Sequence, residues 1–403
     1  MIRAFILLVI LTSLGWWLDR EHQAGRFQRV DELFLDFLVA NARDRFEKAS
    51  PSVEKPVVLV KMRVADKEEY AGWPPRPLDW QMVLKGLQPF DPAVLVIPET
   101  LMWGSPSPEF VREAAEALMP FPSTVLGVEA QLATGANSPA FLGGLDDALP
   151  RFEKFSAEFD AVPALGALIT APDELLRRQA EIGITFTRKD EDRTLLPYAL
   201  QEGGRLRPTV LAQAMARVSS TPYATHRLLL GPGAGAYLAN GGFVPLSPAG
   251  EFVLNAKQTI PEVDALNLMT VEMADALTVQ DKMNLRGPGK VFVIGTDDDT
   301  SGGLARVHAQ ALAQVLAMPR IHLLSGLLQW VIWIVAALAG FWLVLRVPQR
   351  KALLRGAAFI FAGLVICFLA FQSALIWCPP TLPAALLAAS ALFARVAGRV
   401  KGK

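Results

Sequence analysis

Long apolar runs lie at both ends of the chain, and shorter patterned segments fill the residues between them. The apolar segments cover residues 1–18, 322–346, 356–377 and 379–398. A helix needs about 20 predominantly apolar residues to cross the hydrocarbon core of a bilayer. The pattern therefore predicts four transmembrane helices, one N-terminal and three C-terminal, with one large domain between the first and the second.

The first apolar segment is short and has two interpretations. It is either an uncleaved anchor or a signal peptide that is removed after export. Its end, from Gly15 to Leu18, contains two tryptophans and lacks the small residues that precede a signal-peptide cleavage site. This ending favours the uncleaved anchor.

Basic residues indicate which ends of the spans face the cytoplasm. Arg3 precedes the first span, a basic cluster at residues 346–355 separates the second span from the third, and the tail at residues 399–403 is also basic. Lys and Arg are enriched in cytoplasmic loops, so four crossings place residues 19–321 outside the cytoplasm. A three-span arrangement is the alternative, and it would place the last basic cluster outside.

Between the spans, extended apolar runs alternate with segments of helical period. Strands are expected at residues 56–64, 92–98, 123–129 and 290–296, and a hairpin within residues 182–200. Further extended arms are expected at residues 241–248 and 251–257, and helices at residues 21–49, 78–90, 107–119, 207–220 and 263–276. The order of these elements predicts an α/β fold, with a mixed sheet and helices on its faces.

Composition narrows the classes of function. Of the 403 residues, 52% are apolar, and 39 basic side chains balance 39 acidic ones, so net charge gives no electrostatic reason to expect nucleic-acid binding. The two cysteines lie within or beside a span, and the four histidines are scattered. Neither a disulfide within the domain nor a zinc site is therefore predicted, and we expect no cofactor or metal.

Common catalytic motifs are missing from the sequence. It contains no nucleophile elbow, phosphate loop or dinucleotide fingerprint. Residues 231–242 are rich in glycine but lack the strand-to-helix setting of a nucleotide site, so we expect a flexible connection there. We predict that the protein is not an enzyme and name no catalytic residue. An extracytoplasmic hydrolase is a further alternative, in which Glu99 and the aspartates at residues 297–299 would act as an acid/base pair.

Six local patterns follow one another along the chain. They occur at residues 57–99, with a Gly-Trp-Pro-Pro-Arg turn, and at residues 182–200, 207–217, 243–255, 285–299 and 306–316. Together with the membrane layout, they resemble the CHASE2 family of bacterial sensory domains. The resemblance implies a stimulus-binding domain outside the cytoplasm, which in this family is usually joined through three membrane helices to a cytoplasmic kinase, cyclase or other output domain. The sequence departs from the family at residues 61–63, Lys-Met-Arg, where an acidic residue is often found.

The predicted ligand site lies beyond the carboxyl ends of the strands, where open parallel sheets place ligands. Its candidate residues are Trp73, Arg76, Glu99, Asp297, Asp298, Asp299 and His308. Carboxylates at this edge can orient a cation or accept hydrogen bonds from a polar molecule. Each feature also has a structural explanation: a helix-capping loop for the aspartates, a packed side chain for His308, and a proline-stiffened turn for the segment that contains Trp73.

These features predict a sensory or ligand-binding protein in the bacterial cytoplasmic (inner) membrane, with a small ligand of unknown identity. Since the sequence ends at Lys403, directly after the basic tail, we expect the signal to pass to another polypeptide. That partner is a separate signalling or envelope protein, and a homodimer of this chain is also considered. The alternative function is a structural or scaffold subunit of an envelope complex.

Overall fold

The computed structural model describes residues 13, 15–22, 24–47, 56–104, 106–133, 145, 149–155, 161–190, 193–221, 225–231, 233–254, 259–270, 277–287, 289–297 and 303–399. The chain divides into two compact units. One unit consists of Met1–Asp44 and Arg320–Lys403, and the other of Arg45–Pro319. The segment before residue 45 therefore groups with the C-terminal apolar helices, whereas the domain expected from the sequence begins at residue 19.

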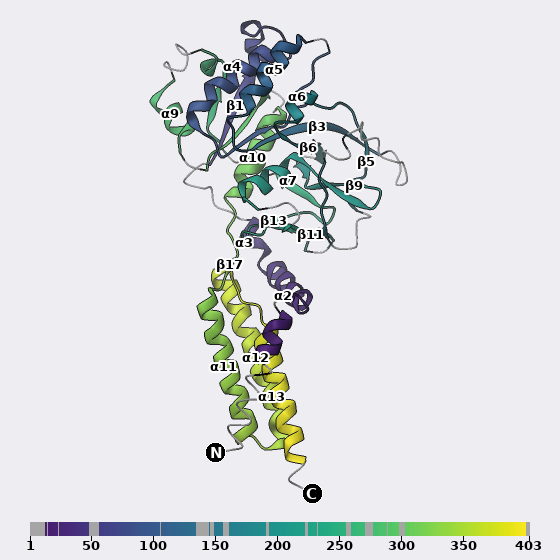
Figure 1. The fold of residues 1–403 in the computed structure, drawn as a ribbon, viewed down its shortest axis with the longest axis vertical. Helices are drawn as coiled ribbons and strands as arrows, with labels where there is room; N and C mark the ends of the chain where they lie inside the picture. Colours follow the sequence, from purple (N-terminus) through teal and green to yellow (C-terminus); the bar gives the residue numbers. More distant parts are fainter. Residues whose placement is uncertain are drawn as a thin grey trace. The chain divides into compact units, whose positions relative to one another are not determined.

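A parallel sheet forms the centre of the larger unit (Figure 1). Its strands run in the order β15-β1-β16-β2-β3, with β6 beside β3, and all these neighbours are parallel. The strand β5 pairs with the end of β3 in the antiparallel direction. The bounds are β1 Val57–Arg63, β2 Val94–Ile97, β3 Thr124–Leu132, β5 Leu165–Leu168, β6 Glu181–Thr185, β15 Glu262–Asp264 and β16 Val291–Asp297. The four strands expected from continuous apolar runs are confirmed as β1, β2, β3 and β16.

The sheet is buried on both faces because alternate residues of its strands contact different helices. Val58 and Val60 of β1 pack in a cluster with α4 and α5, whereas Val57 and Leu59 pack in a cluster with α7 and α10. Figure 1 shows these two helix layers on opposite sides of the sheet. The bounds of the helices are α4 Pro77–Leu87, α5 Pro108–Leu118, α7 Val210–Val218 and α10 Leu304–Leu316. A strand buried on both faces needs the continuous apolar sequence that β1 has.

The start of α4 shows how local sequence sets an element boundary. Pro77 is the first residue of the helix, where the missing N–H leaves no hydrogen bond unmade. The buried Asp79 carboxylate accepts hydrogen bonds from the backbone N–H groups of Arg76, at 2.7 Å, and Ala71, at 2.9 Å. Asp79 therefore connects the turn after β1 to the first turn of the helix.

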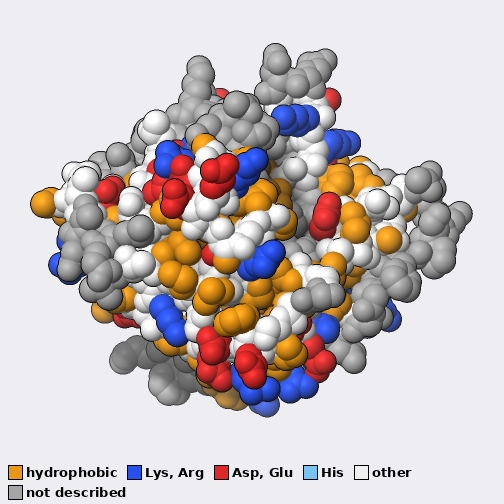
Figure 2. Space-filling model, turned by 90° about the horizontal axis from the view of Figure 1, so that it is seen from above, with side chains coloured by type: hydrophobic (Ala, Val, Ile, Leu, Met, Phe, Trp, Pro, Cys, Tyr) orange, Lys and Arg blue, Asp and Glu red, His pale blue; other side chains and the backbone are white. Residues whose placement is uncertain are grey.

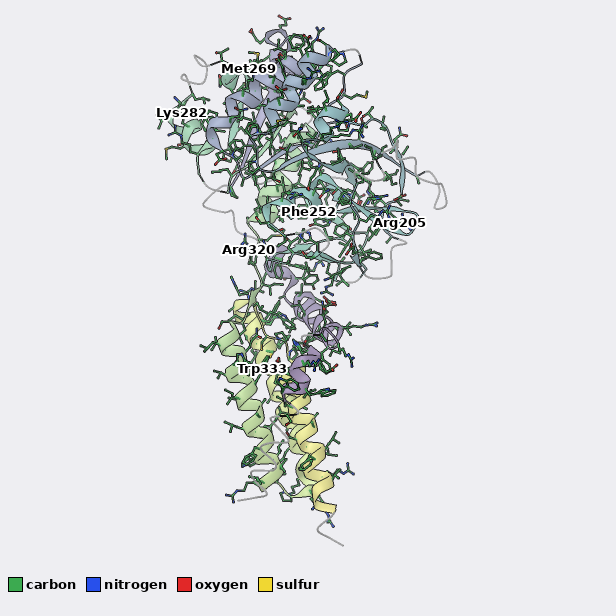
Figure 3. All side chains as sticks on the ribbon, in the orientation of Figure 1. Arg205, Phe252, Met269, Lys282, Arg320 and Trp333 are labelled. Atoms are coloured by element: carbon green, nitrogen blue, oxygen red, sulfur yellow. The ribbon has the colours of Figure 1, made fainter. Side chains whose placement is uncertain are left out.

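Smaller sheets surround this centre, and Phe252 (Figure 3) is buried in the same hydrophobic cluster as α7 and α10. The sheets have the orders β13-β12-β11-β4, β14-β8-β7 and β10-β9. Their bounds are β4 Lys154–Phe155, β7 Arg188–Asp190, β8 Arg193–Pro197, β9 Ala199–Glu202, β10 Arg205–Pro208, β11 Arg227–Leu229, β12 Gly235–Tyr237, β13 Phe243–Pro245 and β14 Glu251–Leu254. Short helical segments occur at α6 Glu174–Arg177, α9 Val279–Leu285, η1 Val64–Glu69, η2 Gln88–Phe90 and η4 Ala265–Leu268.

Two expectations for the domain are wrong, and a third is only partly right. The helix expected at residues 263–276 is replaced, in its described part, by the end of β15 followed by η4, because Val263 pairs with β1 far away in the sequence. The glycine-rich stretch at residues 231–242 contains strand β12 rather than only a flexible connection. The hairpin within residues 182–200 exists between β7 and β8, but β6, which precedes it, joins the central sheet.

The smaller unit contains α11 Gly326–Arg346 and α12 Gln349–Ala374, which are long and apolar enough to cross a membrane. The helix α13, Thr381–Arg399, packs against both (Figure 1), but its apolar part ends at Val396 and is shorter. Most of the first predicted span lies outside the described residues. The described part of the chain therefore supports two membrane-spanning helices, not the four predicted.

Short elements complete this unit. The helix α2, Gln28–Asn41, contacts α12, and α3, Arg43–Glu47, follows it. The strands β17 His322–Leu323 and β18 Ile376–Trp377 pair in parallel just outside the ends of α11 and α12. On α11, the rings of Trp330 and Trp333 (Figure 3) lie 4.9 Å apart.

Candidate functional site

The central sheet has a switch point at β16. The strands β1 and β2 lead into α4 and α5 on one face, whereas β16, which lies between them, leads into α10 on the other face. The connections after neighbouring strands therefore leave in opposite directions. At such a point an open parallel sheet forms a crevice outside the carboxyl ends of its strands, and ligands bind there in many α/β proteins.

Glu99 lies directly after β2 and reaches across to the end of β16. Its Oε1 accepts hydrogen bonds from the backbone N–H and the hydroxyl of Thr296, both at 2.5 Å. This approach depends on Gly295, because a Cβ atom there would lie 2.8 Å from Glu99 Oε1 and 2.8 Å from the Cβ atom of Ala305. The missing side chain at residue 295 thus leaves room for the carboxyl group.

The environment of Glu99 favours its protonated form. Burial raises the pKa of the carboxyl group, and the two hydrogen bonds from Thr296 lower it by less, so the net shift is upward. A carboxyl group with a raised pKa can change its charge at a pH closer to neutral than an ordinary glutamate. It can also donate a hydrogen bond when protonated.

Arg306, in the first turn of α10, holds two carboxylates from two strands. Its Nε and Nη2 donate to the buried Asp297 at the end of β16, with an Nη2 distance of 2.6 Å. Its Nη1 and Nη2 also donate to Glu262 of β15. Lys61 of β1 donates to Glu262 Oε2 at 3.0 Å. We call these four residues the Arg306 cluster.

Charge and burial act together on the Arg306 cluster. Burial alone would raise the pKa of Glu262, but the hydrogen bonds and positive charges of Arg306 and Lys61 outweigh it, so the pKa is lowered. The hydrogen bonds of Asp297 and Glu262 to Arg306 raise the pKa of the guanidinium group, which stays charged. The pKa shifts of Glu262 and Arg306 therefore both favour the charged forms, whereas the shift of the neighbouring Glu99 favours the neutral form.

Two further ion pairs, both made by Arg63, lie at the same edge of the sheet. Arg63, the last residue of β1, donates to Asp264 of β15 at 2.8 Å and to Asp66 at 2.6 Å. Burial raises the pKa of Asp264, although the N–H of Leu266 and the charge of Arg63 oppose the shift.

Acidic and basic side chains alternate with apolar ones on the face that Figure 2 shows, so charge of one sign does not dominate that face.

The structure brings some of the predicted site residues together. Glu99 accepts a hydrogen bond from Thr296, the residue before Asp297. The side chains of the predicted residues Glu99 and Asp297 therefore both lie at the end of β16. The carboxylates have different partners, Thr296 for Glu99 and Arg306 for Asp297, which does not favour a direct acid/base pair. Asp298 and Asp299 lie outside the described residues.

The other predicted residues have structural contacts. The ring of Trp73 lies 5.6 Å from that of Tyr70 and packs against the α4 and α5 cluster, while Arg76 is exposed at the start of α4. His308 is buried on α10, and its Nδ1–H donates to the carbonyl of Leu304 at 2.9 Å. Burial lowers the pKa of His308 to about 4, so the ring is neutral at physiological pH. Among the described contacts, none joins these side chains to Glu99 or to the Arg306 cluster.

Arg306 and Glu262 were not predicted as site residues. Arg306 lies in the pattern at residues 306–316, but its partner Glu262 lies in a strand that was not expected. The signal was present as charge at the ends of adjacent strands: the register places Lys61 beside Asp264 and Arg63 beside Asp297. Reading that signal requires the strand order, which local patterns do not provide.

The smaller unit has a separate apolar pocket of about 550 Å³. Residues of the N-terminal helical segment, α11 and α13 line it: Trp16, Asp19, Trp330, Trp333, Leu338 and Leu382 are among them. Asp19 is the one ionisable residue in this lining. The pocket therefore suits hydrocarbon or an apolar side chain rather than a polar ligand.

The chemistry at the sheet edge suits binding of a polar molecule. Glu99 offers a carboxyl group that changes between donor and acceptor, and the Arg306 cluster offers charged groups close by. The described residues contain no group of three or more His, Cys, Asp or Glu side chains that could hold a metal ion. No family model, curated protein or solved structure matches this chain.

Proposed function

We propose that this chain is a membrane-anchored sensory or ligand-binding protein of the bacterial inner membrane, with its large domain outside the cytoplasm. The observation that carries the proposal is the switch point at β16, where Glu99 and the Arg306 cluster lie at the ends of adjacent strands. The same chain contains two helices that can cross a membrane. The resemblance to CHASE2 sensory domains supports this combination of a binding domain and membrane helices.

The proposal includes a four-crossing topology. Its four spans are the first apolar segment, α11, α12 and α13. The basic residues at 346–355 then lie in the cytoplasm, and residues 19–321 lie outside it.

The site offers a physical route for a signal. Arg306 connects α10 to Asp297 of β16 and Glu262 of β15, so a ligand that competes for these groups changes how α10 is held on the sheet. In the sequence, α10 is followed by α11 with residues 317–325 between them. A shift between two packings of α10 can thus reach a span, provided that the ligand binds one packing more tightly. A partner protein would then detect the changed span.

Ligand binding can be tested on the full chain in lipid nanodiscs by thermal unfolding. Calcium chloride, succinate and glycerol serve as probes for a cation, an anion and a polyol. We expect one class of probe to raise the unfolding temperature of the wild-type protein but not of Glu99→Gln or Arg306→Lys. Equal shifts in wild type and both variants would show that binding occurs elsewhere.

One observation favours the second candidate, a scaffold subunit of an envelope complex. Each of the three nitrogens of Arg306 already donates to Asp297 or Glu262, so the network is closed by its own members. A closed network stabilises a domain without needing a ligand. If no probe shifts the unfolding temperature while the chain is recovered in a stable complex, the scaffold function is favoured over the sensor.

A further inference from the structure

The helix α2 has three faces with different surroundings. The buried face contains Asp31, Leu38 and Val39. An exposed apolar face contains Val30, Leu33 and Phe37, with exposed fractions of 55%, 63% and 52%, and Phe34 lies between them. Arg29, Glu32 and Asp36 form a polar face. The spacing of the apolar residues, at i, i+3, i+4 and i+7, places them in one stripe along the helix.

The buried face fixes α2 to the end of α13. The Asp31 Oδ1 atom accepts hydrogen bonds from the backbone N–H of Thr381, at 3.1 Å, and from its hydroxyl, at 2.6 Å. Thr381 is the first residue of α13. The other carboxylate oxygen of Asp31 lies 3.0 Å from Nε2 of His22. The helix is therefore tied to the end of the helical unit that carries the turn between α12 and α13.

The exposed apolar face continues onto a membrane-spanning helix. The ring of Phe37 lies 6.1 Å from that of Phe368 in α12, and the ring of Phe34 lies 6.2 Å from that of Trp377. Next to Phe368, Leu369 of α12 has an exposed fraction of 59%. The surface of a membrane-spanning helix that no other helix covers faces lipid, so the stripe on α2 borders a lipid-facing surface.

We propose that α2 lies in the outer interface of the membrane, with Val30, Leu33, Phe34 and Phe37 buried in the lipid and the polar face in water. Helices with one apolar and one charged face adopt this position at bilayer surfaces. The occupant of the apolar face is the bilayer, because that face continues onto the exposed surface of α12. The inference rests on the proposed function only in assuming that α12 crosses the membrane.

Spin-label accessibility on the full chain tests the position of α2. The background variant carries Cys367→Ser and Cys378→Ser, and single labels are attached after Leu33→Cys, Asp36→Cys or Leu369→Cys. The chain is reconstituted in bilayers of phosphatidylethanolamine and phosphatidylglycerol, with size-exclusion chromatography to confirm that each variant is folded. Oxygen partitions into lipid and a nickel chelate stays in water, so the ratio of their collision rates reports the depth of each label.

We expect the labels at positions 33 and 369 to collide mainly with oxygen, and the label at position 36 mainly with the nickel chelate. If position 369 is in lipid while position 33 collides mainly with the nickel chelate, the interfacial position of α2 is overturned but the membrane arrangement survives. Low collision rates with both reagents at position 33 would show a protein partner on that face and would also overturn the inference. If position 369 itself collides mainly with the nickel chelate, the membrane arrangement fails first, and the inference fails with it.

Discussion

At the residue scale, the stability of the domain depends on the ion pair between Arg306 and the buried Asp297. The Asp297 side chain is fully buried, and Arg306 supplies its charged hydrogen-bond donors. Removing one partner of a buried ion pair leaves the other charge uncompensated, which costs about 3 to 5 kcal/mol. We therefore expect Arg306→Met to lower the free energy of unfolding by roughly this amount, measured by denaturant unfolding followed with near-ultraviolet circular dichroism.

The control for this variant is Arg178→Met. Arg178 pairs with Glu174 one helical turn away, and both side chains are about two-thirds exposed, at 67% and 66%. An exposed pair at this spacing is screened by solvent and contributes little to stability, so we expect a much smaller loss than in Arg306→Met. Equal losses in the two variants would contradict the structural role of the Arg306 cluster.

We expect Glu99 to make the folded protein less stable as pH rises, whereas a salt-bridged carboxylate makes it more stable. Its pKa is raised in the folded state, so above about pH 4, where the unfolded carboxyl ionises, the folded protein retains a proton that the unfolded chain has lost. Folding therefore loses stability as pH rises toward the folded pKa. In Glu99→Gln this loss is absent, and we expect the variant to gain stability relative to wild type between pH 4 and pH 7.

Unfolding midpoints across this pH range measure the effect. Glu68→Gln, on an exposed side chain, is the control for the loss of one carboxylate elsewhere in the domain. A difference between Glu99→Gln and wild type that stays constant with pH would show that Glu99 does not hold its proton more tightly in the folded protein.

The predictability of the site differed from residue to residue. Glu99 and Asp297 could be expected because each follows an apolar strand, and strand ends are visible in the sequence. Glu262 was not expected in a strand, because its strand has only three residues, is defined by pairing with β1, and runs into the helix expected at residues 263–276. Arg306 could not be selected without knowing which side of α10 faces the ends of β15 and β16.

At the element scale, small residues in the helical unit have two different surroundings. A Cβ atom at Gly340 would lie 2.4 Å from the hydroxyl oxygen of Ser390 in α13, and one at Gly356 would lie 2.6 Å from the Cβ of Ala391. At Gly326 and Gly363, by contrast, a Cβ atom would meet nothing within 4 Å. Packing within the chain therefore accounts for Gly340 and Gly356 but not for the other two.

Leucine substitutions distinguish the glycines that are packed against another helix from those that are not. Gly340→Leu should separate α11 from α13 and lower stability by about 1 to 3 kcal/mol, the usual cost of overpacking, or more because the contact is so close. Gly363→Leu should leave stability unchanged within about 0.5 kcal/mol. Thermal unfolding in detergent compares the two, and equal destabilisation would mean that the helices pack differently from the arrangement described.

The elements themselves follow the sequence where burial is continuous. The strands β1, β2, β3 and β16 and the helices α4, α5 and α7 were expected because each presents a long apolar run or a helical apolar stripe. Short strands such as β12 and β15 were not, because three residues carry too little periodicity to distinguish a strand from a turn. The position of β15 depends on pairing with β1, which is remote in the sequence, whereas β12 pairs with its sequence neighbours β11 and β13.

At the scale of the whole molecule, the four-crossing topology predicts opposite locations for two sites. Gly203 lies in a tight turn between β9 and β10, so an inserted reporter should be tolerated there. A reporter that is active only outside the cytoplasm should be active at this turn and silent when fused after Lys403. The reverse pattern would contradict the extracytoplasmic location of the domain, and activity at both positions would favour the three-span arrangement.

The proposed signalling in trans predicts that a partner touches the membrane helices. Phe361 of α12 has an exposed fraction of 69% and lies close in sequence to Gly363, where the helix surface is open, whereas Phe371 of the same helix is fully buried. A photoreactive benzoylphenylalanine in place of Phe361 should therefore capture another membrane protein, or a second copy of this chain, in native membranes. The same substitution at Phe371 should crosslink only within the chain.

Gly363→Leu should reduce capture from position 361, because small residues allow close helix approach. Only monomer from both positions, in cells and in mild detergents, would count against both the sensor and the scaffold and would favour the enzyme alternative.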